Sequence, residues 1–150
     1  MNNPKVISVN ISEKKGTVKH PVKEITITRA GVMEDAHAGE WHRQVSLLAV
    51  ESVEKFSKEA KRKINFGEFA ENITTQGIEL PQCHIFDRFR IGDAELELTQ
   101  IGKECHGTAC AIFKEVGNCV MPKEGIFCRV IKTGKIKPGD RIVYVPKVYR

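Results

Sequence analysis

The stretch FDRFRIGDAELELT (residues 86–99) sets a pattern that is found along much of the chain. Apolar residues at positions 86, 89 and 91 lead up to a turn at Gly92-Asp93. From Ala94 to Thr99 apolar and polar residues then alternate strictly, which is the period of a β-strand with one face in the core. The chain on both sides of this turn is therefore expected to be extended and half-buried.

Similar short apolar runs, separated by glycine and proline, continue in both directions. They predict further strands at residues 6–11, 24–28, 45–50, 71–75, 127–132 and 141–145. Residues 52–63 are predicted as a helix with one apolar face, and residues 109–116 as a second, shorter helix. This pattern predicts a mainly β fold, a closed or nearly closed β-barrel with one or two short helices. Because no linker, repeat or composition shift interrupts the sequence, residues 1–150 are expected to form a single domain.

The charge balance is basic, with 24 Lys and Arg against 19 Asp and Glu, a net charge of +5 and a pI near 9.0. The basic residues are scattered among acids, and only 7% of the residues are aromatic, so no platform for stacking nucleic-acid bases is evident. We therefore expect the positive charge to serve a small anionic molecule and not a nucleic acid.

No segment of the sequence is typical of secretion or of membrane insertion. The first ten residues hold one short apolar run, and no stretch approaches the roughly 18 apolar residues that span a bilayer. A cytoplasmic location without membrane contact is therefore expected, and the five cysteines are expected to stay reduced there. Their odd number also argues against full pairing in disulfides.

The segment QIGKECHGTAC (residues 100–110) concentrates residues with reactive side chains. It follows a predicted strand and places Cys105 in the loop beyond, where rigid scaffolds often carry functional groups. Lys103 and a protonated His106 would raise the thiolate fraction of a neighbouring thiol. A thiolate binds soft metals and carries transferable sulfur, so Cys105 is the candidate functional residue.

The other cysteines leave alternatives open. Cys83 and Cys128 are expected to pack in the core, since free cysteine is among the most buried residue types. A structural zinc site is the competing interpretation of the remaining cysteines, although their spacing lacks a C-x-x-C pair. Its ligands would come from Cys105, His106, Cys110 and Cys119.

Several ordered segments carry a resemblance to a known family. Residues 98–106 (LTQIGKECH), 119–131 (CVMPKEGIFCRVI) and 134–140 (GKIKPGD) resemble the MOSC domain. This is the C-terminal domain of molybdenum cofactor sulfurases, and it also occurs as small stand-alone bacterial proteins. Residues 31–45 are similar to the family's early Gly-Asp and Arg-containing segment, and residues 67–78 (GEFAENITTQGI) to its Gly-x-Phe-x-Glu-Asn motif.

The resemblance implies a twisted β-barrel with a few helices, and it implies that Cys105 is the functional thiol. In relatives that bind the molybdenum cofactor (molybdopterin), the equivalent cysteine is a ligand to molybdenum. Cys105 is therefore expected to be both the catalytic residue and the metal ligand. The residues expected to bind the anionic cofactor are Arg43, Lys103, His106, Arg129 and Asn72.

Two mechanisms fit this resemblance. Cys105 either ligates molybdenum, as in reductases of N-hydroxylated compounds, or accepts a sulfane sulfur and passes it on. The residue directly before Cys105 is Glu104. Because an arginine at this position would favour the reductase, the glutamate weakens the first mechanism. A non-enzymatic carrier module for metal or pterin is the alternative.

Partners follow from the same resemblance. No part of the sequence resembles the aminotransferase-like domain of the sulfurases, so no pyridoxal phosphate is expected to bind this chain. The expected partners are molybdopterin or a related anionic small molecule, and a cysteine desulfurase or a molybdoenzyme.

Overall fold

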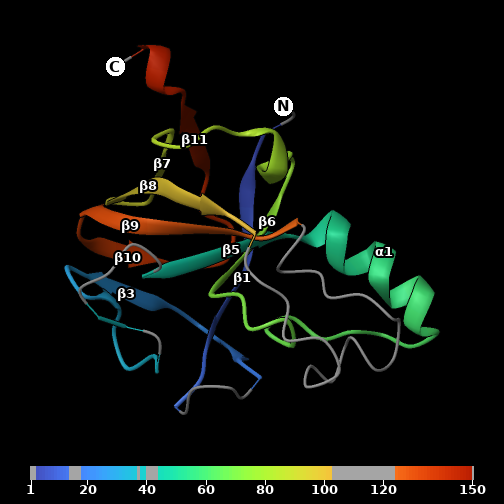
Figure 1. The fold of residues 1–150 in the computed structure, drawn as a ribbon. Helices are drawn as coiled ribbons and strands as arrows, with labels where there is room; N and C mark the ends of the chain where they lie inside the picture. Colours follow the sequence, from blue (N-terminus) through green and yellow to red (C-terminus); the bar gives the residue numbers. More distant parts are fainter. Residues whose placement is uncertain (1–2, 14–17, 37, 40–43, 103–123, 150) are drawn as a thin grey trace.

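The computed structural model describes residues 3–13, 18–36, 38–39, 44–102 and 124–149, which are mainly β-strands with one α-helix (Figure 1). The strands are β1 (Lys5–Ile11), β2 (His20–Val22), β3 (Ile25–Thr28), β4 (Gly31–Val32), β5 (Val45–Ala49), β6 (Ile73–Gln76), β7 (Arg88–Ile91), β8 (Ala94–Ile101), β9 (Ile126–Lys132), β10 (Gly134–Ile136) and β11 (Ile142–Val145). The helix is α1 (Val50–Ala60), and the 3-10 turns are η1 (Leu80–Gln82) and η3 (Lys147–Tyr149).

Eight strands form one mixed sheet in the order β11-β7-β8-β9-β5-β6-β1-β2. Neighbouring strands are antiparallel except β5 and β6, which run parallel because α1 forms the connection between them. The strands β10, β3 and β4 form a second, antiparallel sheet. This smaller sheet contacts the large one through β8 and β9.

The predicted closure into a barrel is not confirmed by the described residues. The large sheet has two end strands, β11 and β2, and the chain turns out of it after β9, so that β10 pairs with β3 instead. One antiparallel bridge between Lys5 and Arg141 brings β1 beside the start of β11. A hydrogen bond from the Val6 amide to the Asp140 carbonyl, at 2.8 Å, supports this contact. The described chain is thus a strongly curved, mainly β fold without a closed sheet.

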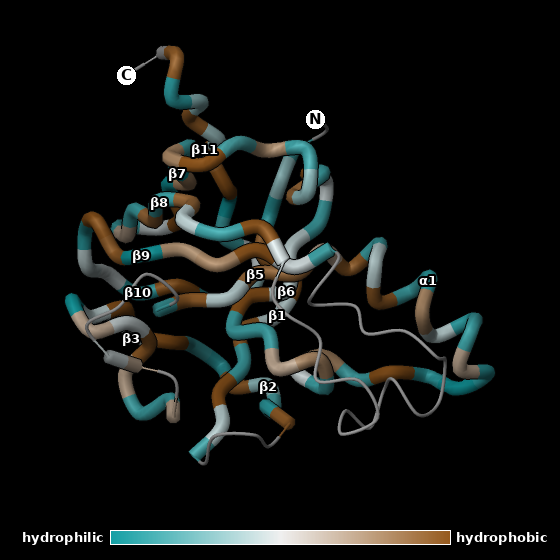
Figure 2. Tube along the Cα trace, viewed as in Figure 1, coloured by the Kyte–Doolittle hydropathy of each residue, from teal (hydrophilic) through white to brown (hydrophobic). Residues whose placement is uncertain are grey.

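The core lies between the two sheets and under the helix. Leu47, Leu96 and Ile126 come from neighbouring strands and are fully buried. All five residues of β5 are buried because α1 packs on its other face, where Phe56 contacts a second apolar cluster around Leu48. Figure 2 shows the hydrophobic stretches concentrated along the central strands. This arrangement makes the central strands a rigid base for the loops at their ends.

Candidate functional site

The segment that carries Cys105 leaves the sheet at the end of β8 and returns at the start of β9. At its base Ile101 pairs with Ile126, and the Gly102 amide donates a hydrogen bond to the Gly125 carbonyl at 2.7 Å. Gly102 has a φ of 69°, in the left-handed region that glycine adopts without steric cost. We call these four base residues the stem, because they hold the two ends of the segment together.

Most of the predicted site residues lie outside the described residues. They are Arg43, Lys103, Cys105, His106, Cys110 and Cys119, together with the predicted helix at 109–116. Their roles stay predictions. The described residues instead show what surrounds the stem.

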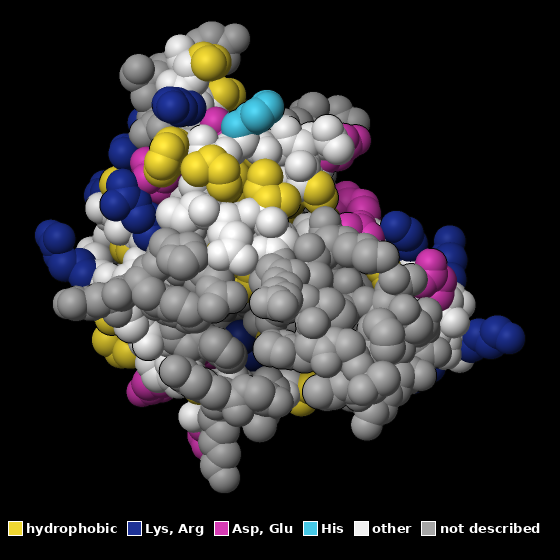
Figure 3. All heavy atoms as spheres, viewed as in Figure 1, with side chains coloured by type: hydrophobic (Ala, Val, Ile, Leu, Met, Phe, Trp, Pro, Cys, Tyr) yellow, Lys and Arg dark blue, Asp and Glu magenta, His cyan; other side chains and the backbone are white. Residues whose placement is uncertain are grey.

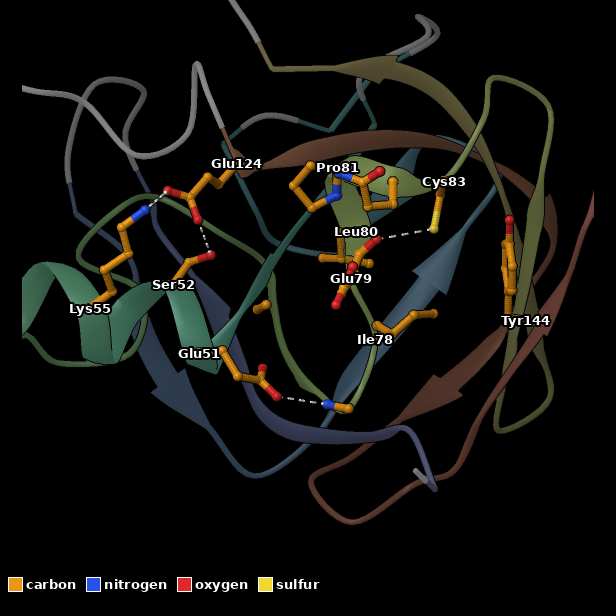
Figure 4. Close-up of a pocket in the computed structure, with 13 residues that line it drawn as sticks. Glu51, Ser52, Lys55, Ile78, Glu79, Leu80, Pro81, Cys83, Glu124 and Tyr144 are labelled. Carbon is orange, nitrogen blue, oxygen red and sulfur yellow. Dashed lines mark hydrogen bonds and ion pairs between the residues drawn. The ribbon is translucent and has the colours of Figure 1, made fainter. Parts of the chain in front are cut away.

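A cavity of about 750 Å³ opens beside the stem. Because Leu47 of β5 lies opposite Ile126, the first turns of α1 reach Glu124, which directly precedes the stem. Glu124 accepts hydrogen bonds from the Ser52 hydroxyl at 2.7 Å and from the Lys55 ammonium at 3.1 Å (Figure 4). The volume is within the range of roughly 300–1,000 Å³ that small-molecule sites occupy. The cavity is lined by Ala49, Glu51, Ser52, Lys55, Gly77, Ile78, Glu79, Leu80, Pro81, Gln82, Cys83, Glu124 and Tyr144.

The opposite wall of the cavity is largely apolar. It comes from residues 78–83, which follow β6, and from Tyr144 of β11 (Figure 4). The Cys83 amide donates to the Leu80 carbonyl at 3.1 Å, which closes the turn η1. The Tyr144 ring stacks on Phe89 with ring centroids 5.6 Å apart. Backbone hydrogen bonds and ring stacking therefore fix the shape of this wall.

The two cysteines that the structure describes are both buried, which confirms the prediction that they pack in the core. Cys83 is 4% exposed, and its thiol donates to the Glu79 carbonyl at 3.7 Å. Burial raises the pKa of the Cys83 thiol to about 11. Cys128, on β9, is fully buried, and burial raises its pKa further. Neither residue supplies a thiolate near neutral pH.

Asn72, predicted to bind the cofactor, cross-links strands in the interior. Its side chain is buried, and its Oδ1 accepts hydrogen bonds from the amide and the hydroxyl of Ser46 at 3.0 and 3.2 Å. Its Nδ2 donates to the Asn10 carbonyl at 3.2 Å. The carboxamide thus connects β5 and β1 through the start of β6, and it does not line the cavity.

Arg129, the other described candidate, lies on the exposed face of β9. Its Nε and Nη2 lie 2.8 and 2.7 Å from the same oxygen of Glu97. Glu97 also accepts a hydrogen bond from Arg88 at 3.0 Å. Although burial opposes it, the two guanidinium groups lower the pKa of Glu97, so its negative charge persists. The charge of Arg129 is therefore directed at Glu97, and Arg129 does not line the cavity.

A buried carboxyl group that the sequence did not single out lies in the same motif as Asn72. Glu71 is fully buried, and its Oε2 accepts hydrogen bonds from the Gly67 amide at 3.0 Å and the Thr74 hydroxyl at 2.9 Å. Burial raises the pKa of Glu71, against these hydrogen bonds that lower it. Among the described residues its Oε1 has no hydrogen-bond partner. The sequence signal was an acid within a motif of glycine and apolar residues.

The sequence patterns also did not predict a buried ion pair. The Lys19 ammonium contacts both carboxylate oxygens of Asp35, at 2.8 and 3.1 Å, and side-chain exposure is 1% for Lys19 and 0% for Asp35. The Asp35 carboxylate also accepts the Ser12 amide at 2.9 Å. Removing either partner leaves a buried charge uncompensated. The ion pair therefore holds together the segments that contain Ser12, Lys19 and Asp35. No sequence pattern connects two residues that meet only through the tertiary fold.

The described part of the chain shows neither a metal cluster nor a membrane helix. Within it, no group of three or more His, Cys, Asp or Glu side chains is placed to hold a metal ion. The cysteines of the zinc alternative, Cys105, Cys110 and Cys119, lie outside these residues, so that alternative stays untested. In the same described ranges, no helix has the length and apolar character needed to cross a bilayer.

Comparisons with known proteins give a family and a fold. The family model of the MOSC domain matches residues 34–143. The solved structure of YuaD from Bacillus subtilis is similar with a TM-score of 0.79 and 16% identity, over 97% of each chain. YiiM from Geobacillus stearothermophilus has a TM-score of 0.76 and 22% identity, over 96% of this chain and 76% of its own. YiiM from Escherichia coli has a TM-score of 0.66 and 20% identity, over 97% and 69%. No curated protein matches the chain.

Proposed function

Because the chain belongs to the MOSC domain family, we propose that it is a molybdenum-cofactor-linked protein that works through the thiolate of Cys105. The family points to a function related to this cofactor, and the matched residues 34–143 include the whole segment between β8 and β9. In this proposal Cys105 is both the catalytic residue and the ligand to molybdenum, a role that suits a soft thiolate.

The observation that carries the proposal is the state of the described thiols. Cys83 and Cys128 are buried with raised pKa values, so they are poor sources of thiolate. The other three cysteines all belong to the segment whose ends the stem holds together. Thiolate chemistry is therefore assigned to this segment, in which Cys105 has a lysine two residues before it and a histidine directly after it.

The size of the cavity suits the pterin of the cofactor, but the charge of its described lining does not suit the phosphate group of the cofactor. The cavity has room for a pterin, but among the described residues its lining carries the carboxylates of Glu51, Glu79 and Glu124 and the ammonium of Lys55. These carboxylates disfavour a phosphate group beside them. We therefore assign the phosphate to other basic residues of the predicted cofactor-binding set, which are Arg43, Lys103 and His106. When it is bound, the cofactor supplies redox chemistry at molybdenum.

Sulfur carriage is the second candidate, because it needs the same thiolate. The Cys105 thiolate would attack the outer sulfur of a persulfide on a partner desulfurase. The sulfur–sulfur bond of that persulfide breaks, the partner's cysteine leaves as a thiolate, and Cys105 keeps the sulfane sulfur. No residue of this chain has to be oxidised or reduced by an outside reagent in this step.

Metal and pterin analysis after anaerobic purification from a molybdenum-replete host tests the proposal. The wild type is expected to carry molybdenum and pterin, with zinc well below one ion per chain. Cys105→Ser is expected to lose both, and Cys83→Ser, the matched control, to keep both. A persulfide on Cys105 without molybdenum would favour the second candidate. Stoichiometric zinc that is lost in Cys110→Ser or Cys119→Ser would replace both candidates with a structural zinc site.

A further inference from the structure

We infer that Glu124 is a positioning residue for Cys105, because it fastens the returning end of the segment 103–123 to the first turns of α1. The connection consists of the Glu124 carboxylate, the Ser52 hydroxyl and the Lys55 ammonium, and we call these three residues the α1 clamp. All three are described residues. Only the choice of Cys105 as the thiol that the clamp serves rests on the proposed function.

The two carboxylate oxygens of Glu124 are held by two different residues of α1. The Ser52 hydroxyl donates to Oε1 at 2.7 Å, and the Lys55 ammonium donates to Oε2 at 3.1 Å (Figure 4). Ser52 is buried, whereas the Lys55 side chain is 59% exposed, and an exposed ion pair contributes little because water screens it. A hydrogen bond to an ionised acceptor is stronger than one between neutral groups. The bond from Ser52 is therefore expected to carry most of the clamp.

Both sides of the clamp are attached to the rigid part of the fold. On one side, α1 follows β5 without an intervening residue, so Ser52 has a fixed place relative to the central sheet. On the other side, Gly125 directly follows Glu124, and its carbonyl accepts the Gly102 amide at 2.7 Å in the stem. The clamp therefore fixes the point at which the segment 103–123 returns to the sheet.

The side chain of Glu124 adds a contact that the stem lacks. The stem joins the two ends of the segment only to each other, through strand pairing and one backbone hydrogen bond. Glu124 connects the returning end to a second element, and its negative charge lies near the start of α1, where the helix dipole favours it. A thiol that depends on neighbouring cations for its thiolate form needs its chain held in one place. Glu124 meets this need for Cys105.

Alkylation of Cys105 over a range of pH, followed by mass spectrometry, tests the inference and requires no molybdenum. Glu124→Ala is expected to slow the reaction at neutral pH about threefold or more and to move its rise to higher pH, because a displaced thiol loses the cations that favour the thiolate. Removing a nearby negative charge would by itself favour the thiolate and speed up the reaction. The direction of the change therefore separates positioning from a direct effect of the charge.

Variants of the clamp identify the contact that matters. Glu124→Gln keeps an oxygen that accepts the Ser52 hydroxyl, so its rate is expected to stay within about twofold of the wild type. Ser52→Ala is expected to slow Cys105 as Glu124→Ala does, and the double variant to add less than about twofold, because both changes remove the same contact. Glu54→Gln, an exposed acid of the same helix, is the matched control and is expected to leave the rate unchanged.

The buried thiols of Cys83 and Cys128 report on global unfolding in the same experiment. Faster alkylation of all the cysteines together in Glu124→Ala would show that Glu124 is merely structural and would overturn the inference. An unchanged or faster reaction of Cys105 alone, or equal slowing by Glu124→Gln and Glu124→Ala, would overturn it as well. Should Glu124→Ala fail to fold, the rate of Cys105 in Ser52→Ala decides by the same criteria. A native protein without molybdenum would contradict the proposed function but leave these rates unchanged, so the two failures are distinguishable.

Discussion

Glu71 shows how a single buried residue can make the stability of this fold depend on pH. Its side chain is fully buried, its pKa is raised by burial, and one carboxyl oxygen has no hydrogen-bond partner among the described residues. The folded state therefore holds the proton of Glu71 above pH 4.5, where the unfolded chain releases it. Stability linked to Glu71 is complete below pH 4.5 and falls as the pH rises towards the folded pKa.

Glu71→Gln is expected to remove this pH dependence, because glutamine is neutral at every pH. The free energy of unfolding of the variant should rise relative to that of the wild type as the pH rises above 4.5. The rise should approach about 1.4 kcal/mol per pH unit while the folded protein alone holds the proton. Urea denaturation at several pH values measures this difference, with exposed Glu54→Gln as the control. A constant difference across this range would show that Glu71 is ionised in the folded protein.

Asn72 shows that membership of a sequence motif does not by itself give the role of a residue. Asn72 was singled out because it belongs to a family motif, but the structure places its carboxamide between Ser46 and Asn10. A motif shows that an amide is needed, and only the tertiary fold shows whether strands or a ligand use it. Cys128 was easier to predict, because it lies in an apolar run of the sequence that already favours burial.

Among the elements, the strands with clear alternation were predicted best. The stretch from Ala94 matches β8, and the run at 6–11 matches β1 within one residue. The helix was predicted at 52–63 but ends at residue 60, because Lys61 takes a left-handed φ of 56°. The short strands β2, β4 and β10 have only two or three residues each, which is too few to show a period.

The attachment of β11 to β7 depends on one buried acid. Asp87 accepts hydrogen bonds from the His84 amide at 2.8 Å, the Lys147 amide at 2.8 Å and the Tyr144 hydroxyl. Although burial opposes it, these donors lower the pKa of Asp87. The side chain thereby connects the turn before β7 with β11 and with η3.

Asp87→Asn is expected to cost about 1–3 kcal/mol at pH 7, because an amide donor then faces groups that are themselves donors. Because the folded pKa is lowered below 3.8, the stabilisation by Asp87 is present above that pH and is lost as the pH falls through the folded pKa. The deficit of the variant should therefore shrink in acid. Urea midpoints of Asp87→Asn and of exposed Asp93→Asn provide the comparison. Equal midpoints at pH 7 would contradict this account of the connection.

For the whole molecule, local patterns predicted the fold class but not how the sheet ends. β1 approaches β11 through contacts such as that of Lys5 with Arg141, which join distant parts of the chain and leave no local pattern. The same holds for the buried pair of Lys19 and Asp35. The distribution of the basic residues was easier to predict. On the face drawn in Figure 3, the Lys and Arg side chains of the described residues are spread among acids without a continuous patch.

Cys105 is proposed as the functional thiol, whereas the described cysteines, Cys83 and Cys128, pack in the core. Burial fixes the behaviour of Cys83 and Cys128, whose raised pKa values make them slow nucleophiles. A loop thiol near Lys103 and His106 should instead be partly ionised and accessible. Cys105 is therefore expected to react faster than Cys83 and Cys128. Its replacement by serine is expected to lower the free energy of unfolding less than the replacement of Cys128.

Mass spectrometry of the native protein during alkylation at neutral pH distinguishes a functional thiol at Cys105 from a packed one. Cys105 is expected to react well before Cys83 and Cys128, because thiolate fraction and access control the rate. Cys105→Ser should unfold within about 1 kcal/mol of the wild type. Cys128→Ser should cost about 1–3 kcal/mol, because it places a hydroxyl in the apolar core. A native protein in which Cys105 resists alkylation, together with a Cys105→Ser variant that is merely unstable, would contradict the assignment of the site.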